Sequence, residues 1–190
     1  MRKIQKMART PSNMLPLGTK APQFTLPDTL SGNTFRLEEL AGNKGTVIMF
    51  ICNHCPFVLH VQEQLVKTAN TYSPKGIGFI AISSNDAKTY PQDAPDKMTL
   101  HAKENHYPFP YLYDESQEVA KAYHAACTPD LYLFDHALKL VYRGQLDDSR
   151  PGNAVPVTGL DLEHALDCLL QNKPNTKAQK PSIGCNIKWK

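Results

Sequence analysis

Two cysteines separated by two residues are the feature of this sequence that most directly suggests chemistry, in the motif Cys52-Asn53-His54-Cys55. An apolar stretch precedes the motif and a segment with helical periodicity follows it. At a helix N-terminus, backbone N–H groups and the helix dipole favour a thiolate, which is the form that attacks a disulfide or a peroxide. We therefore expect Cys52 to lie at the helix N-terminus and attack. Cys55, one turn further on the same face, is expected to resolve the mixed disulfide.

His54 lies between the two cysteines and could influence both. A positive charge there would lower the pKa of Cys52 and, by stabilising the reduced form, make the protein a stronger oxidant. The alternative is a loop histidine with little effect. The motif could also be half of a zinc site, but zinc needs two further ligands at comparable spacing. With no second C-x-x-C, and only His60 and Cys127 as obvious extra candidates, we predict no metal.

The elements that must position the motif alternate between strands and helices. Three apolar runs, at 46–51, 77–82 and 131–134, are typical of strands covered on both faces. A stretch that alternates apolar and polar residues predicts a fourth strand at 138–142. Apolar residues three or four apart predict three helices at 55–72, 116–124 and 158–170. The Pro- and Asp-rich segment 85–98 is predicted to be a loop.

The two ends of the chain lack these patterns. We therefore expect residues 1–15 to be a flexible arm, residues 16–173 to be one domain, and residues 174–190 to be a polar tail that carries Cys185. Among the 190 residues, 41% are hydrophobic and 21% are charged, which is typical of a globular protein.

Charge and cysteine content narrow the class of protein. A net charge of +3 is too small to indicate nucleic-acid binding. No run of 18 apolar residues predicts a membrane helix, and no secretory signal pattern is present. Five cysteines, an odd number, argue against a disulfide framework. We expect a cytoplasmic protein whose cysteines are catalytic, metal-binding or simply buried.

Three segments resemble the thioredoxin-like superfamily, in the branch shared by peroxiredoxin-type proteins and thioredoxin-like reductases. Residues 17–28 are similar to the family's opening G-x-x-A-P-x-F-x-L segment. The C-x-x-C lies between a predicted strand and a predicted helix, as in the family. Residues 119–144 are similar to the family's helix, cis-proline loop and last two strands. C-N-H-C-P-F with a C-terminal P-S-I-G-C-N-I-K-W-K also resembles one bacterial group of thioredoxin-family proteins. The resemblance, over residues 17–170, implies an α/β protein with a thioredoxin-like fold: a central mixed sheet flanked by helices, with an N-terminal hairpin extension.

The resemblance also implies roles outside the motif. Pro129 matches the family's cis-proline, and Thr128 before it would offer backbone groups to a bound peptide or thiol. If this loop faces the active site, Cys127 could be a third redox thiol, or else a small buried side chain. Cys185 could reach back to a reactive thiol or to another chain, or be an idle exposed thiol. Cys168 is expected to pack in the last helix.

The sequence departs from the family at informative positions. Ile51 stands where many thioredoxins have Trp, and the strand before the motif lacks the family's buried acid. Another base, or water, would then have to accept the Cys55 proton. The peroxiredoxin signature P-x-x-x-T/S-x-x-C is absent, because Ile48 and Cys52 occupy its proline and Thr/Ser positions.

These observations favour a thiol–disulfide oxidoreductase with Cys52 attacking and Cys55 resolving. It would act on protein or small-molecule disulfides and thiols without an organic cofactor or metal, and a separate reductase or thiol pool would recycle it. The first alternative is an antioxidant thiol peroxidase, in which Cys52 becomes a sulfenic acid that Cys55, Cys127 or Cys185 resolves. The second is a copper-binding protein using both motif cysteines and a histidine, because soft thiolates suit Cu(I).

Overall fold

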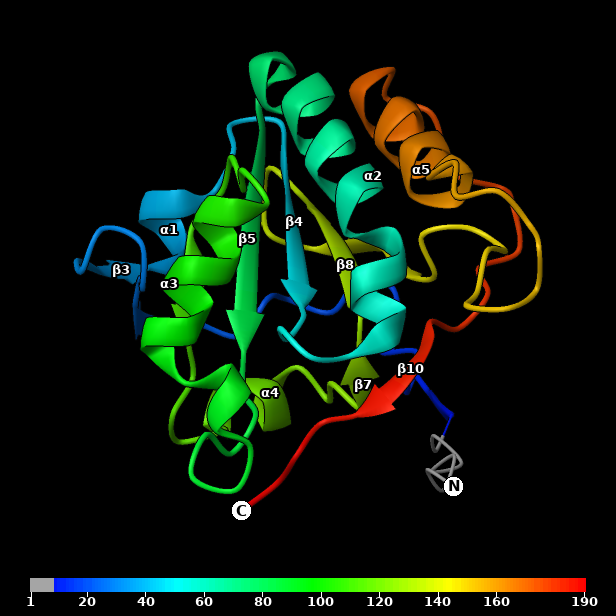
Figure 1. Ribbon diagram of the computed structural model, residues 1–190. Helices are drawn as coiled ribbons and strands as arrows, with labels where there is room; N and C mark the ends of the chain where they lie inside the picture. The colour runs from blue at the N-terminus through cyan, green and yellow to red at the C-terminus, as the bar shows by residue number, and fades with distance from the viewer. Residues whose placement is uncertain (1–8) are drawn as a thin grey trace.

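The computed structural model describes residues 9–190 and is built around a five-stranded sheet with the order β6-β5-β4-β8-β9 (Figure 1). Its strands are β4 (Gly45–Phe50), β5 (Ile77–Ser83), β6 (Tyr111–Tyr113), β8 (Asp130–Asp135) and β9 (Leu140–Gly144). β4 and β5 are parallel, as are β5 and β6, whereas β8 runs antiparallel to β4 and β9. This is the mixed sheet that the sequence predicts.

Helices cover both faces of the sheet. Residues that alternate along β4 point to opposite faces, so Val47 and Met49 pack on one side while Ile48 and Phe50 pack on the other. The first side is covered by α2 (Pro56–Tyr72), α3 (Pro95–Glu104) and α5 (Leu160–Leu170) (Figure 1). The second side is covered by α1 (Leu37–Leu40), α4 (Glu118–Ala122) and the N-terminal hairpin of β2 (Thr25–Pro27) and β3 (Thr34–Arg36).

The end of the chain differs from the tail without regular structure that the sequence predicts. β10 (Ile183–Asn186) lies between β1 (Thr10–Pro11) and β7 (Cys127–Thr128) and pairs antiparallel with both. A four-residue strand is too short to show a period, and its hydrogen-bond partners lie far away in the sequence, so no local pattern indicated it. Part of the expected flexible arm is therefore a strand, while residues 1–8 lie outside the described residues. The division of the chain at residues 15 and 173 stays a prediction.

The segment predicted as a loop at 85–98 also contains regular structure. A short 3-10 helix, η2 (Pro91–Asp93), is followed by the first turn of α3. Prolines at the first position of each element explain both starts, since proline fits the first helical turn, where its missing N–H costs no hydrogen bond. Within the described residues, no helix is long and apolar enough to cross a bilayer.

Candidate active site

The two motif cysteines lie between the central strand, β4, and the helix that follows it, α2. Cys52 follows β4, and Cys55 is the N-cap residue of α2, with extended backbone angles of φ −74° and ψ 119°. The expectation that Cys52 occupies the helix N-terminus is therefore wrong. Pro56 is the reason, because the ring of a proline disfavours helical angles in the residue before it. The helix dipole and the first free N–H groups act on Cys55 instead.

The loop before β8 faces both cysteines. A cis peptide bond joins Thr128 and Pro129, as the resemblance implies. The Cys55 thiol donates a hydrogen bond to the carbonyl oxygen of Thr128 at 3.1 Å, and Cys52 Sγ lies 3.4 Å from Thr128 Oγ1. Both cysteines are almost fully enclosed, with exposed fractions of 2% for Cys52 and 0% for Cys55. Thr128 thus contacts both sulfurs, one through its backbone and one through its side chain.

A third cysteine joins this cluster from the end of the chain. The register of β10 on β7 sets Cys185 opposite Thr128, the residue whose carbonyl oxygen accepts from the Cys55 thiol. Cys185 also packs against the core cluster that contains both motif cysteines. Hydrogen bonds from Cys185 and from Cys52 lower the pKa of Cys55. The three cysteines thus lie around one residue, Thr128.

The approach of β10 to this loop requires a glycine. A Cβ atom on Gly184 would lie 2.0 Å from the carbonyl oxygen of Thr128, far inside van der Waals contact. The absence of a side chain at Gly184 is what lets the backbone of β10 lie against the loop and bring Cys185 to the motif.

The two remaining cysteines are not part of this arrangement. Cys127 is buried, and its thiol points at the carbonyl oxygen of Pro129 at 3.6 Å. Burial and the nearby charge of Asp130 raise its pKa, which disfavours the reactive thiolate. A redox role for Cys127 stays a prediction. Cys168 lies on α5, where its sulfur is 3.5 Å from Nε2 of His164.

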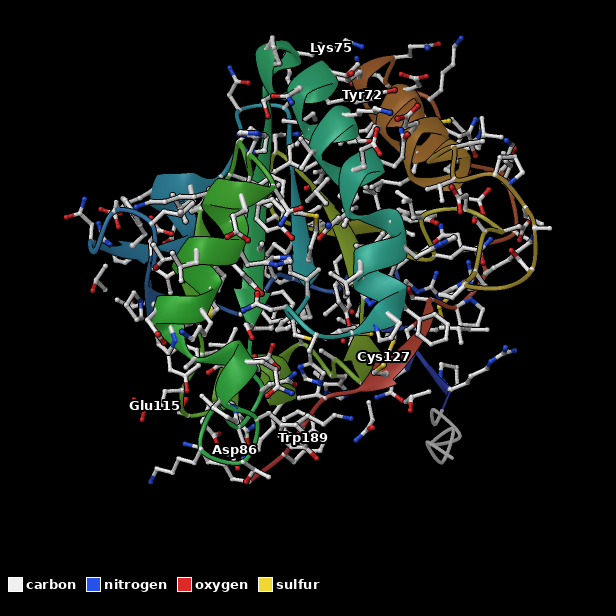
Figure 2. All side chains as sticks on the ribbon, in the orientation of Figure 1. Tyr72, Lys75, Asp86, Glu115, Cys127 and Trp189 are labelled. Carbon is white, nitrogen blue, oxygen red and sulfur yellow. The ribbon has the colours of Figure 1, made fainter. Side chains whose placement is uncertain are left out.

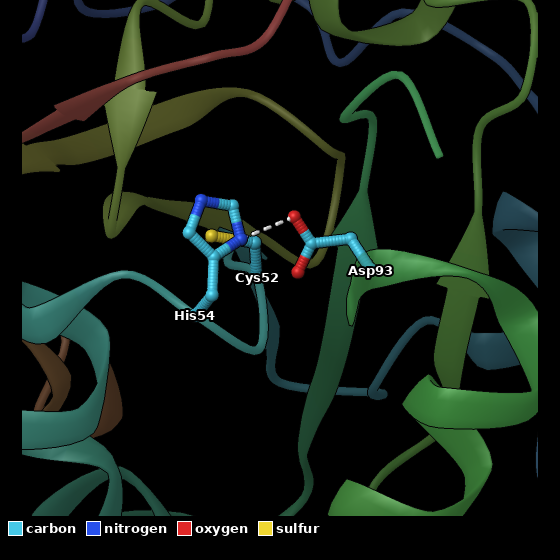
Figure 3. A group of neighbouring side chains, drawn as sticks. All are labelled: Cys52, His54 and Asp93. Carbon is cyan, nitrogen blue, oxygen red and sulfur yellow. Dashed lines mark ion pairs between the residues drawn. The ribbon is translucent and has the colours of Figure 1, made fainter. Parts of the chain in front are cut away.

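A buried acid that the sequence analysis missed stands beside Cys52. Asp93, at the end of η2, is fully buried and lies 2.7 Å from Nδ1 of His54 (Figure 3). Its oxygens also accept hydrogen bonds from the backbone N–H of Asn53 and the side chain of Asn85, at 2.9 and 2.8 Å. The hydrogen bond with Cys55, burial and the charge of Asp93 together hold the pKa of Cys52 well above its usual value. The expected lowering by His54 is not observed.

The signal that could have indicated Asp93 is indirect. The lack of an acid in the strand before the motif implies that a base must come from elsewhere. Residues 85–98, however, contain three aspartates, Asp86, Asp93 and Asp96, and residue type alone does not distinguish them. Only packing selects Asp93, because η2 folds back over the motif and the other two carboxylates do not reach it.

One set of side chains in the described part of the chain could hold a metal ion. Ligand atoms of Cys52, His54 and Asp93 all lie within 4.8 Å of one another. The carboxylate of Asp93 is already occupied by its hydrogen bonds to residues 53 and 85, so a metal would have to compete for it. His60, the other histidine considered, lies 2.7 Å from Oγ of Ser149 and takes no part.

Comparisons with known proteins agree with this architecture. The Redoxin family matches residues 16–160. A structure from Geobacillus kaustophilus, described as an uncharacterised conserved protein, is 62% identical, with a TM-score of 0.95 and coverage of 97% of both chains. A hypothetical protein from Sinorhizobium meliloti is 49% identical, with a TM-score of 0.93 and coverage of 95% of this chain and 98% of that chain.

A more distant structure shares the fold. The thioredoxin domain of a thiol-disulfide oxidoreductase from Bacteroides vulgatus is 22% identical, with a TM-score of 0.58 and coverage of 68% of this chain and 88% of that chain. Among curated proteins, none matches the chain. The thioredoxin-like fold that the sequence predicts is confirmed.

Proposed function

Because the chain belongs to the Redoxin family, whose chemistry is thiol-based oxidation and reduction, we propose that it is a thiol–disulfide oxidoreductase. The observation that carries the proposal is the pair of adjacent thiols, Cys52 and Cys55, that face one residue, Thr128. Two thiols held this close can exchange a disulfide between themselves and a substrate. A cytoplasmic location is part of the proposal, because five cysteines, an odd number, argue against the disulfide framework of a secreted protein.

In the proposed reaction, Cys52 attacks a substrate disulfide. Because the pKa of Cys52 is raised, the attack needs a base to take its proton. We assign this role to His54, which has a ring nitrogen within 4.8 Å of Cys52 Sγ and a carboxylate oxygen of Asp93 2.7 Å from its Nδ1. One substrate sulfur leaves as a thiol, and the other remains bonded to Cys52.

Cys55 then resolves the mixed disulfide. The hydrogen bond from Cys185 lowers its pKa and remains when Cys52 is bonded to the substrate sulfur, so Cys55 forms a thiolate without a dedicated base. Attack on Cys52 Sγ forms the Cys52–Cys55 disulfide and releases the reduced substrate. A separate reductase or thiol pool completes the cycle. The family's buried carboxylate lies in the strand before the motif and acts on the second cysteine. Here the buried carboxylate is that of Asp93, and it acts on the first cysteine, Cys52.

The test compares two substrates with matched variants. The reduced protein should react rapidly with a small protein disulfide, and with hydrogen peroxide no faster than a free thiol does. Cys52→Ser should abolish disulfide reduction, and Cys55→Ser should accumulate the mixed disulfide. Cys168→Ser, remote from the site, is the control and should behave as wild type. A peroxide reaction faster by orders of magnitude would contradict the proposal and favour the peroxidase alternative.

A further inference from the structure

The C-terminal strand delivers a thiol to one motif cysteine in particular. Cys185 lies opposite Thr128 in the pairing of β10 with β7. The carbonyl oxygen of Thr128 accepts from the Cys55 thiol, while Cys52 Sγ lies against Thr128 Oγ1. Cys185 lowers the pKa of Cys55 and is not among the groups that shift the pKa of Cys52, so Cys55 is the motif sulfur that Cys185 faces. Thiol–disulfide exchange proceeds through three sulfurs, with the attacked one in the middle, and this cluster has that order.

The segment around Cys185 is fixed on both sides. Upstream, Ser182 Oγ donates to the carbonyl oxygen of Pro129 at 2.7 Å, and the Ser182 backbone N–H donates to Ser12 Oγ at 3.0 Å. Downstream, the N–H of Lys188 donates to Asn85 Oδ1 at 2.8 Å. These bonds run from the cis-proline loop to the loop after β5, so the segment crosses the active-site end of the sheet.

Burial and the figures support the same placement. Ile187 is 1% exposed and anchors the segment in the core, and the backbone N–H of Asp86 donates to the carbonyl oxygen of Lys188. Figure 2 places Asp86 and Trp189 at one end of the molecule, where this segment finishes. A thiol held at its target reacts without the entropic cost of finding it. Cys185 is thus preorganised next to Cys55, and the segment is not a freely moving tail.

We propose that Cys185 is a third redox thiol that exchanges with the Cys52–Cys55 disulfide, an inference that rests on the proposed function. The Cys185 thiolate attacks Cys55 Sγ, the Cys52–Cys55 bond breaks, and a Cys55–Cys185 bond forms. Cys52 departs as a thiolate and takes up the proton that Cys185 lost to solvent. One disulfide is consumed and one is made, so the step needs no external oxidant.

This exchange gives the oxidised protein two isomers. In the first, the disulfide joins the motif cysteines and Cys52 is blocked. In the second, the disulfide joins Cys55 to Cys185 of the C-terminal strand, and Cys52 is a free thiol. The second isomer can engage another thiol-reactive partner at Cys52 before it is reduced. The C-terminal strand therefore takes part in the chemistry as well as covering the site.

Disulfide mapping tests the exchange directly. Trypsin places both motif cysteines in the peptide 45–67 and Cys185 in the peptide 178–188. The full-length protein is oxidised with oxidised glutathione, alkylated with N-ethylmaleimide, digested and analysed by mass spectrometry. We expect a cross-link between these peptides in the wild type, with Cys52 alkylated in the cross-linked species. Cys52→Ser should retain the cross-link, Cys55→Ser should lose it, and the control Cys168→Ser should retain it.

The outcomes separate this inference from the proposed function. If the motif disulfide forms and a protein disulfide is reduced normally, but neither the wild type nor Cys52→Ser yields the cross-link, the exchange is overturned and the proposed function stands. If the cross-link forms but no protein disulfide is reduced, the proposed function is contradicted, whereas the exchange of Cys185 with the motif disulfide is still supported. A cross-link found only in covalent dimers on a non-reducing gel also overturns the inference, because the geometry is within one chain.

Discussion

Asp93 shows how one residue can change the roles within a familiar motif. Its carboxylate is buried beside Cys52 and paired with His54. The negative charge penalises a thiolate on Cys52, and the contact with Nδ1 fixes where the imidazole ring of His54 lies. Asp93 is thus a positioning residue, which acts on the reacting sulfur through the histidine and through its own charge.

Replacing Asp93 with Asn should separate these two effects. The midpoint of the pH profile for alkylation of Cys52 should move down, because the charge that raises its pKa is gone. Disulfide reduction at neutral pH should nevertheless slow by about a hundredfold, since the histidine proposed as the base for Cys52 loses the carboxylate that holds its ring.

The matched control for this prediction is Asp96→Asn. Asp96 lies in the first turn of α3 and its side chain is 69% exposed. This variant should leave both the alkylation profile and the rate unchanged. An unchanged pH midpoint in Asp93→Asn would show that the charge does not act on Cys52.

Asp130, next to the cis-proline, predicts a pH dependence of stability. Burial raises its pKa to about 7, and its Oδ1 has no hydrogen-bond partner among the described residues. In the unfolded chain the pKa is near its ordinary value of about 4. The folded protein therefore holds a proton that the unfolded chain has lost between these values. The resulting stability is complete below about pH 4 and is lost as the pH rises through about 7.

Asp130→Asn should remove this dependence. The three-unit difference corresponds to roughly 4 kcal/mol in the free energy of unfolding. Urea unfolding at about pH 4 and about pH 8 should show a smaller difference in the variant than in the wild type, mainly because the variant is more stable at the higher pH. An equal difference in both proteins would mean that Asp130 does not carry the buried proton.

At the scale of elements, β10 closes the active site because its backbone can touch the cis-proline loop. Gly184 makes this contact possible, since any Cβ there would collide with the carbonyl oxygen of Thr128. Backbone atoms on both sides leave no side chain that could move aside. A larger residue at this position must therefore separate β10 from β7.

Gly184→Ala should expose the cysteines without altering any of them. Alkylation of Cys52 and Cys55 in the reduced native protein should accelerate by about tenfold, which corresponds to a closed state weakened by about 1.4 kcal/mol. Mass spectrometry of the labelled peptides measures the rates. Gly32→Ala, in the β2–β3 turn, is the control. At its φ of 75° an alanine is strained, but the Cβ would meet nothing within 4 Å, so this variant weakens the protein without touching β10. Equal acceleration in both variants would indicate a general loss of stability.

At the scale of the whole molecule, apolar side chains on both faces of the sheet hold the site in place. α5 contributes to the face that also packs α2, so its core residues support the helix that begins at Cys55. Leu166 of α5 is fully buried, whereas Leu160 at the start of the same helix is 63% exposed. The two leucines offer a matched pair for measuring what this packing contributes.

Leu166→Ala should lower the free energy of unfolding by about 2 to 5 kcal/mol, because it removes buried methyl groups and leaves a cavity. Leu160→Ala should change it by less than about 0.5 kcal/mol. Urea unfolding followed by circular dichroism measures both. A similar loss in the two variants would contradict the packing of α5 against the sheet.

Much of the sheet and its helices could be predicted because their patterns are local. The apolar runs that became β4, β5 and β8 and the helical period of α2 are visible within short windows of sequence. β10 and α3 were missed, since one is too short to show a period and the other begins inside a segment rich in proline and aspartate. Elements of this kind owe their structure to the partners on which they pack.

The sequence by itself determined the C-x-x-C between strand and helix, the Thr128–Pro129 loop and the thioredoxin-like fold, because residue types and spacing along the chain encode them. Only the tertiary structure decided which residues share the site. Asp93 bonds to a backbone group 40 residues away, and Cys185 reaches Cys55 through the pairing of β10 with β7. Such contacts arise from the packing of distant segments, which leaves no periodic signal in either one.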